Sequence, residues 1–411
     1  MKYDITSSQV GNVHIDRGTF LNTIEATIEK EVSQDDHILR CVPLPRNEVI
    51  GMKKFIIFFL LICMIGAGGY LGYKYYETMQ TIETDSPDPQ QEEIADDPVV
   101  VELEPEPVKT VEIFKGTERP IAVMIDNNKN AWPQSGLNDA YLVYEIIVEG
   151  GETRLMACFK GANLEKIGPI RSSRHYFLDY AMENDAIYVH FGWSPQAESD
   201  IASYGINNVN GLIESSKTFW RVKDKSAPHN AVTNTEKILE VAAKRKYRTE
   251  SDFTSVLNYV VDEVELTGGI MANEVTIPYS TSNKVKYEYN PETKMYTRYS
   301  KGKKQTDWIT KEDVTTKNII ITKADNYTLT DKENKGRQGI KNIGTLDGYY
   351  ITNGMAIPIT CTKNSRTSKT EYKDLEGNII EVNDGRTFIQ ICPLDSNILI
   401  EPGDSTNSVE E

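Results

Sequence analysis

Short apolar runs in the middle of the chain predict a domain in which strands and helices alternate. Ile121–Asp126 reads I-A-V-M-I-D, a run typical of a strand buried on both faces. A serine at Ser172 precedes a segment with apolar positions on one helical face, and two more helices are predicted to begin at Pro195 and Thr235. Residues 111–262 therefore read as a mixed α/β domain.

The pattern changes near residue 274 to strands separated by turns. K-V-K-Y-E-Y and K-M-Y-T-R-Y alternate in polarity, and Asn353-Gly354 between two apolar runs is a strong hairpin signal. We therefore expect a linker over 263–273 and a β-rich domain over 274–402. The predicted fold class is α+β, a mixed α/β domain followed by a mostly β domain, behind a single transmembrane helix.

The predicted transmembrane helix rests on Phe55–Tyr73, nineteen residues without a charge. At 1.5 Å per residue this run is long enough to cross a hydrocarbon core of ~30 Å. Lys53 and Lys54 precede it and tyrosines gather at its other end, which favours a cytoplasmic N-terminus and extracytoplasmic C-terminal domains. The expectation is a cytoplasmic segment over 1–51 and a single-pass anchor in the cell membrane over 52–76.

A start at Met52 is the alternative. The apolar run would then be a signal peptide, and Cys63 would carry a lipid. The residue before a lipidated cysteine is normally small, whereas Ile62 stands here, and this favours the uncleaved anchor.

The net charge of -16 is concentrated in one segment. Between Glu77 and Pro107 there are eleven acidic residues, five prolines and no Lys or Arg, a composition that predicts a disordered stalk over 77–110. A disordered tail is expected over 403–411. Because the remaining chain is close to charge balance, a nucleic-acid partner is not expected.

The five cysteines show no C-x-x-C spacing, so neither a zinc knuckle nor a thioredoxin-type site is predicted. Cys158 and Cys392 lie in apolar, strand-like segments and are expected to be buried core residues. The candidate histidines His190 and His229 show no H-x-H or H-x-x-x-H spacing, which argues against a metal site. We expect no metal and no cofactor.

Polar residues at strand ends and turns between Tyr144 and Asn230 predict a site. Glu145 and Glu149 are spaced so that one strand face would carry both, which suits acid and base catalysis or, alternatively, ion pairing with nearby arginines. The predicted catalytic residues are Glu145, Glu149, His190 and His229, and the predicted ligand-binding residues are Arg154, Arg171, Ser172, Arg174, Ser194, Gln196 and Asn230. The arginines suit bidentate capture of phosphate or carboxylate. We expect these side chains to converge on one cleft.

Several motifs occur in a fixed order: V-Y-E-x-x-V-E-G-G-x-T-R, K-I-G-P-x-R-S-x-R, H-x-G-x-S-P-Q-A and P-H-N. With G-Y-Y-I-T-N-G-x-A-I-P-I-T and G-R-T-F-I-Q-I farther on, the chain resembles the YerB-like family of Gram-positive envelope proteins from about Thr117 to Leu394. The resemblance implies two extracytoplasmic domains and no particular reaction.

Two functions follow from these patterns. The first is an envelope protein that binds an anionic cell-wall component or a protein partner. The second is an envelope hydrolase or transferase acting on an anionic glycan, with Glu and His as acid and base and Arg as substrate clamps. The sequence contains no G-x-x-x-x-G-K loop, so an energy-coupled role is not expected.

Overall fold

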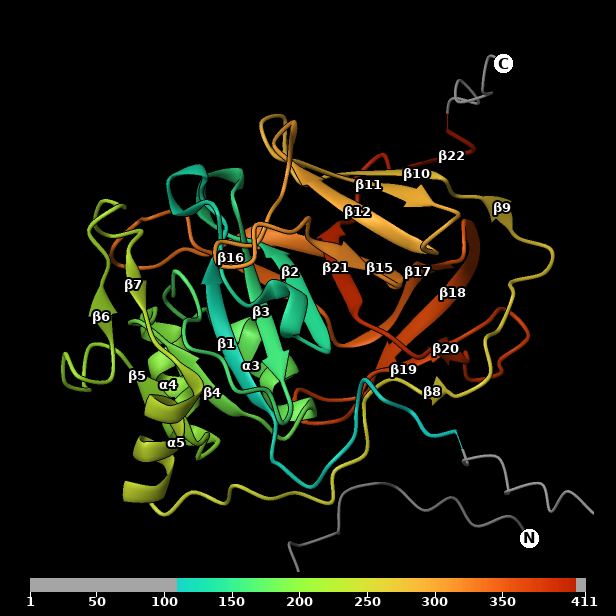
Figure 1. Cartoon of the computed structure of the whole chain (residues 1–411). Coiled ribbons are helices and arrows are strands. Elements are labelled where there is room, and N and C mark those ends of the chain that lie inside the picture. Colours follow the sequence, from blue (N-terminus) through green and yellow to red (C-terminus); the bar gives the residue numbers. More distant parts are fainter. Residues whose placement is uncertain (1–108, 404–411) are drawn as a thin grey trace, which may run out of the picture. The chain divides into compact units, whose positions relative to one another are not determined.

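The structure, a computed structural model, describes residues 109–403, and strands make up most of its regular secondary structure (Figure 1). The predictions for the cytoplasmic segment, for the anchor, for the stalk up to residue 108 and for the tail from residue 404 lie outside the described residues. The same holds for Cys41 and Cys63.

A twelve-stranded sheet runs in the order β19-β18-β17-β15-β21-β2-β3-β1-β4-β5, with β16 paired to β15 and β9 paired to β18. Its strands are β1 (Ile121–Asp126), β2 (Leu142–Ile147), β3 (Thr153–Phe159), β4 (Ile187–His190), β5 (Asn208–Asn210), β9 (Ile270–Met271), β15 (Asn318–Thr328), β16 (Gln338–Lys341), β17 (Gly344–Thr352), β18 (Met355–Lys363), β19 (Glu371–Lys373) and β21 (Thr387–Pro393).

Three smaller sheets accompany it. The six-stranded sheet contains β10 (Glu274–Pro278), β11 (Lys284–Asn290), β12 (Met295–Ser300), β13 (Lys303–Lys304), β14 (Thr315–Thr316) and β22 (Leu399–Glu401). The two pairs are β6 (Trp220–Arg221) with β7 (Ala231–Val232), and β8 (Tyr259–Val260) with β20 (Val382–Asn383).

Helices are few and short in the described part of the chain. The α-helices are α3 (His175–Glu183), α4 (Pro195–Ser203) and α5 (Thr235–Lys244), and the 3-10 turns are η1 (Lys129–Ala131), η2 (Leu137–Asp139) and η3 (Glu149–Gly151). The three predicted α-helices are thus confirmed near their predicted starts. Asparagine and serine side chains cap two of them, Ser194 at α4 and Asn234 at α5.

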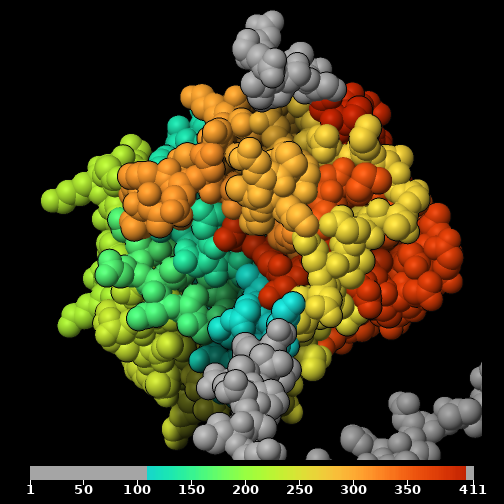
Figure 2. Space-filling model, turned by 45° about the vertical axis from the view of Figure 1, so that its right-hand side comes forward, coloured from blue at the N-terminus to red at the C-terminus, as the bar shows by residue number. Residues whose placement is uncertain are grey.

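The strands of the two predicted domains form one continuous sheet. β21, near the end of the chain, lies between β2 and β15 and is parallel to both, so that Phe388 is opposite Val143 on one side and Ile319 on the other. The space-filling view shows the early part of the described chain, in cyan and green, in direct contact with the late part, in orange and red (Figure 2).

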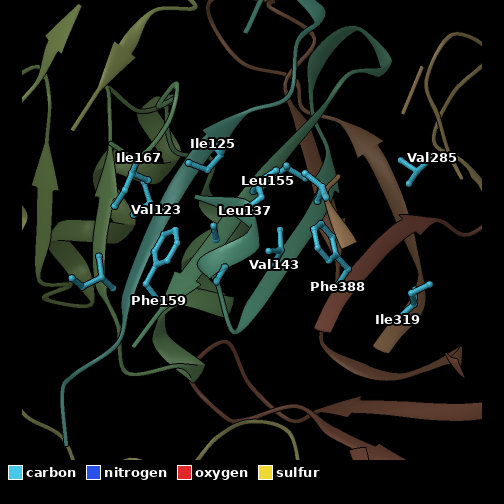
Figure 3. Close-up of a cluster of buried hydrophobic side chains, with 14 of the residues drawn as sticks. Val123, Ile125, Leu137, Val143, Leu155, Phe159, Ile167, Val285, Ile319 and Phe388 are labelled. Carbon is cyan, nitrogen blue, oxygen red and sulfur yellow. The ribbon is translucent and has the colours of Figure 1, made fainter. Parts of the chain in front are cut away.

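Two hydrophobic clusters cover the two faces of the large sheet. The first contains alternate residues of β1 to β3 and side chains of the six-stranded sheet and α5, including Val123, Val143, Leu155, Tyr287 and Ile238. Figure 3 shows this cluster extending from β1 to Phe388 and Ile319. The second cluster lies on the other face, where α3 and α4 contribute, and includes Met124, Tyr144, Met156, Phe177 and Ile201. Both faces of β1 are therefore covered, which explains its uninterrupted apolar sequence.

The hairpin predicted at Asn353-Gly354 is confirmed. β17 and β18 pair antiparallel from Gly344 to Lys363, and both loop residues have positive φ, 49° at Asn353 and 74° at Gly354. A Cβ at Gly354 would lie 2.9 Å from the Tyr289 ring, so glycine is required there for conformation and for space.

The core positions predicted for Cys158 and Cys392 are confirmed, since both are buried free thiols, as is Cys361. Burial raises the pKa of Cys361 to about 12 and that of Cys392 to about 11. Neither thiol is therefore set up to act as a nucleophile.

The predicted fold class is wrong. The described chain is mostly β, and its three α-helices, of nine, nine and ten residues, cover parts of a sheet shared by both predicted domains. Local periodicity identified strands and helices but carried no information on the long-range pairing of β2 with β21. The single transmembrane helix is not supported either. Within residues 109–403 no helix is both long and apolar enough to cross a bilayer, and Phe55–Tyr73 lies outside that range.

Candidate functional site

Strand β1 ends at Asp126, where several predicted site residues meet. β1, β4 and β5 are parallel, so their carboxyl ends lie at one edge of the sheet, a common location for ligand sites. The Asp126 Oδ2 atom is 2.7 Å from His229 Nδ1 and 3.4 Å from Arg171 Nε. Asp126 is buried, whereas the side chain of Arg171 is 26% exposed and that of His229 is 14% exposed.

Two further arginines hold Glu149 beside this group. Arg154 is opposite Asp126 in the β1–β3 ladder, and its guanidinium is 3.8 Å from Glu149 Oε2. Arg174, which precedes α3, places Nε 2.6 Å from Glu149 Oε1. The η3 turn positions Glu149 with the help of Gly150 and Gly151, which both have positive φ. The arginine cluster is defined here as Arg154, Arg171 and Arg174.

The charges of the arginine cluster affect one another. Burial lowers the pKa of Arg154 to about 10, and the positive charges of Arg174 and Arg171 add to this, although Glu149 opposes it. Burial raises the pKa of Glu149, but its hydrogen bond to Arg174 and the charges of Arg174 and Arg154 outweigh this, so the net pKa is lowered. Three guanidinium groups thus face two carboxylates, Glu149 and Asp126, which leaves an excess of positive charge.

Glu145 lies elsewhere, on the opposite face of the sheet. It is fully buried, and its Oε2 atom is 2.6 Å from Nη2 of Arg298, a fully buried residue of β12. Asn127 and Thr153 donate hydrogen bonds to its other oxygen at 3.1 and 2.7 Å. Pairing with the nearby arginines thus holds for Glu149. Glu145 pairs instead with the distant Arg298, and its side chain has no access to solvent.

His190 is also enclosed. Its Nδ1 atom is 2.8 Å from the carbonyl oxygen of Gly192, to which it donates, and its Nε2 atom is 3.2 Å from Asn208 Oδ1. The imidazole is packed between Tyr188 and Trp193. Burial lowers the pKa of His190 to about 4, so the ring is neutral at physiological pH and serves the local structure.

The two predicted serines have structural hydrogen bonds. Ser172 donates to the carbonyl oxygen of Phe191 at 2.9 Å, and its own carbonyl accepts from Arg154. Ser194 accepts from the amide of Ala197 at 3.2 Å and caps α4.

Asn230 and Gln196 do not join the arginine cluster. Asn230 accepts a hydrogen bond from Arg221 at 2.6 Å and donates to the carbonyl oxygens of Val222 and Lys225, which holds the loop between β6 and β7 together. Gln196, near the start of α4, has a buried Oε1 atom without a hydrogen-bond partner in the described structure.

The structure therefore brings together Glu149, Arg154, Arg171, Arg174 and His229 and separates them from Glu145 and His190. Sequence reasoning missed Asp126, although a carboxylate directly after a buried apolar strand follows the same strand-end pattern as the other candidates. Among the described residues no group of three or more His, Cys, Asp or Glu side chains is arranged to hold a metal ion.

A cavity of about 520 Å³ lies away from this edge. It is lined by Ile121 and Phe159, at the opposite ends of β1 and β3 from Asp126 and Arg154, together with Leu239 of α5. The arginine cluster is thus a polar surface at the edge of the sheet, separate from this cavity.

Comparisons with known proteins place the chain in a family. Residues 108–248 match the N-terminal domain, and residues 275–389 the C-terminal domain, of a protein family of unknown function, DUF3048. A protein of Bacillus subtilis (strain 168), "Putative lipoprotein YerB", is 33% identical over 294 residues, which cover 68% of this chain and 83% of that protein. The crystal structure of YerB protein from Bacillus subtilis is similar with a TM-score of 0.62 at 30% identity, over 69% of this chain and 94% of that one. The chain therefore belongs to the YerB-like DUF3048 family.

Proposed function

We propose that this protein is an extracytoplasmic envelope protein that binds an anionic component of the cell wall through the arginine cluster. Membership of the YerB-like family and the lipoprotein name of the relative support the location. That name also favours attachment by a lipid at Cys63 over a membrane-spanning helix.

The observation that carries the binding role is the position of Arg171. Its guanidinium is the most exposed of the arginine cluster, and a single nitrogen approaches Asp126 at 3.4 Å, longer than a good charged hydrogen bond. The other nitrogens are free to form the two parallel bonds with which arginine binds phosphate or carboxylate. The side chains of Arg154 and Arg174 are more buried than that of Arg171, and their charges add to the positive potential at this edge of the sheet because water screens them little.

The test is the binding of the full-length protein to isolated Bacillus subtilis cell walls, intact or stripped of their anionic polymers. Arg171→Gln is expected to weaken binding to intact walls at least about tenfold, because one charged hydrogen bond contributes about 1.5–3 kcal/mol. Thermal stability should change little, since Arg171 is partly exposed and loosely paired.

Arg248→Gln is the matched control, because Arg248 is an exposed arginine that pairs with Asp185 away from the cluster. It should bind intact walls as the unmodified protein does. Equal binding to stripped and intact walls, or full binding by a folded Arg171→Gln variant, would contradict the proposal.

A second candidate function, hydrolysis or transfer on an anionic glycan, is favoured by the Asp126–His229 pair. A carboxylate 2.7 Å from Nδ1 orients an imidazole so that Nε2 can act as a base. This pair would replace the acid and base roles assigned from sequence to Glu145 and His190, which are buried. Turnover of wall polymer that is lost in His229→Gln, while binding is retained, would establish this alternative; no turnover by the unmodified protein would exclude it.

A further inference from the structure

A second group of positive charges surrounds Trp308. The Nζ atom of Lys225 is 4.1 Å from the centroid of its indole ring, and that of Lys166 is 4.4 Å from it. The Nζ atom of Lys311 donates to the Trp308 carbonyl oxygen at 2.6 Å. Three ammonium groups thus contact one tryptophan, and Lys166, Lys225 and Lys311 are called the lysine cluster below.

The lysine cluster is built by both family domains. Lys166 and Lys225 belong to the region that matches the N-terminal domain, and Lys311 to the region that matches the C-terminal domain. The backbone amide of Trp308 donates to the Gln134 carbonyl oxygen at 2.7 Å, which fastens the two regions together at this point. The cluster is therefore a product of the folded two-domain structure.

The lysine cluster is not neutralised by ion pairs within the described residues. None of the ion pairs there includes Lys166, Lys225 or Lys311. The carboxylate of Asp307, the residue before Trp308, instead accepts hydrogen bonds from backbone amides, as at Gly136 with a distance of 2.9 Å.

The three ammonium groups of the lysine cluster also repel one another. Burial lowers the pKa of Lys225, Asp224 raises it, and the positive charges of Lys311 and Lys166 lower it again. Like charges held this close favour binding of an anion, because the anion offsets their repulsion.

Two loops link the lysine cluster to His229 and Asp126, and Asp126 is the ion-pair partner of Arg171 in the arginine cluster. Lys225 and His229 both lie on the loop between β6 and β7, on the left of Figure 1. The Nζ atom of Lys225 donates to the Trp132 carbonyl oxygen at 2.7 Å, and the Trp132 indole donates to Asn127 Oδ1 at 3.3 Å. Asn127 directly follows Asp126. A short chain of contacts thus connects the two positive groups.

We infer that the lysine cluster is a second anion-binding site, and that the ligand is a polymer with repeated phosphate groups that reaches from Arg171 to Trp308. Ammonium groups are compact point charges that suit phosphate, whereas the arginine side chain can hold a neighbouring phosphate with two bonds. The identity of the polymer as a wall component rests on the proposed function, but anion binding at the lysine cluster does not.

The experiment measures binding of the full-length protein to long-chain polyphosphate, to orthophosphate and to poly-glutamate. Changing Lys166, Lys225 and Lys311 together to glutamine is expected to weaken polyphosphate binding about tenfold or more and to reduce its dependence on salt concentration. A variant with Lys335, Lys341 and Lys373 changed to glutamine is the matched control, because it also loses three positive charges. These three lysines lie outside the lysine cluster and pair with Glu333, Asp325 and Glu371. Circular dichroism establishes that both variants are folded.

Equal polyphosphate binding by the unmodified protein and the folded lysine-cluster variant would overturn the inference, as would an equal loss in the control variant. Poly-glutamate binding as tight as polyphosphate binding would overturn the assignment to phosphate, and orthophosphate binding as tight as polyphosphate binding would overturn the assignment to a polymer. If wall binding is unaffected by Arg171→Gln but polyphosphate binding is lost in the lysine-cluster variant, the proposed function fails and the second site stands.

Discussion

Replacing Arg298 by methionine is expected to lower the free energy of unfolding by about 3–5 kcal/mol. Arg298 and Glu145 have no exposed surface, and the change would leave the Glu145 carboxylate buried without its cationic partner. The side-chain oxygen of Gln305, which accepts a hydrogen bond from Arg298, would lose this donor as well. Urea denaturation followed by circular dichroism measures the difference.

The exposed ion pair of Arg248 with Asp185 is the control for this change. Arg248→Met should cost less than about 1 kcal/mol, because exposed pairs contribute little. Combining Arg298→Met with Glu145→Gln should recover part of the stability, since the stranded charge is then removed. A loss below 1 kcal/mol for Arg298→Met alone would contradict the buried pair.

His190 is expected to make the free energy of unfolding strongly dependent on pH. Burial lowers its pKa from 6.5 to about 4, so the folded protein keeps the ring neutral while the unfolded chain takes up a proton. The corresponding stability is complete above about pH 6.5 and is lost as the pH falls toward 4. By linkage the full loss amounts to roughly 3 kcal/mol.

The measurement compares urea denaturation at pH 7 and pH 4 for the unmodified protein and for His190→Gln. Glutamine retains a donor for the Gly192 carbonyl but does not titrate, so the variant should lose clearly less stability between the two pH values. Other titrating groups act equally in both proteins. Identical losses in the two proteins would show that His190 is accessible to protons in the folded state.

Local elements were predictable because their signals are local. The strand at Ile121–Asp126, the helices that start near Ser172, Pro195 and Thr235, and the two-residue turn at Asn353-Gly354 depend on neighbouring residues only. Each sequence signal, whether apolar run, cap or turn residue, lies within the element that it specifies.

The shared sheet was not predictable in the same way. The register that places Phe388 opposite Val143 joins residues more than two hundred positions apart, and no short pattern encodes it. The strand-like composition of G-R-T-F-I-Q-I indicated a strand but not its neighbours. The division into an α/β fold and a β fold followed from reading each region alone.

The site shows the same limit. Strand-end signals in the sequence led to Arg154, Arg174 and Glu149, which do meet, because their segments are adjacent along the chain. Arg298, the partner of Glu145, is 153 residues away in β12, where buried and partly exposed residues alternate. The sequence of this strand does not show which of its two faces is buried. His190 ends a strand, as a ligand-edge residue would, but the following loop folds over it.

The position of β21 has a consequence for the order in which this protein can reach its native state. During synthesis the residues that form β2 and β15 emerge well before Thr387–Pro393, and both strands have an unpaired edge until β21 arrives between them. Open edges favour pairing with other chains. The emerging chain must therefore be kept from premature association until β21 is available, and a chain that ends before β21 cannot join its two halves into one sheet.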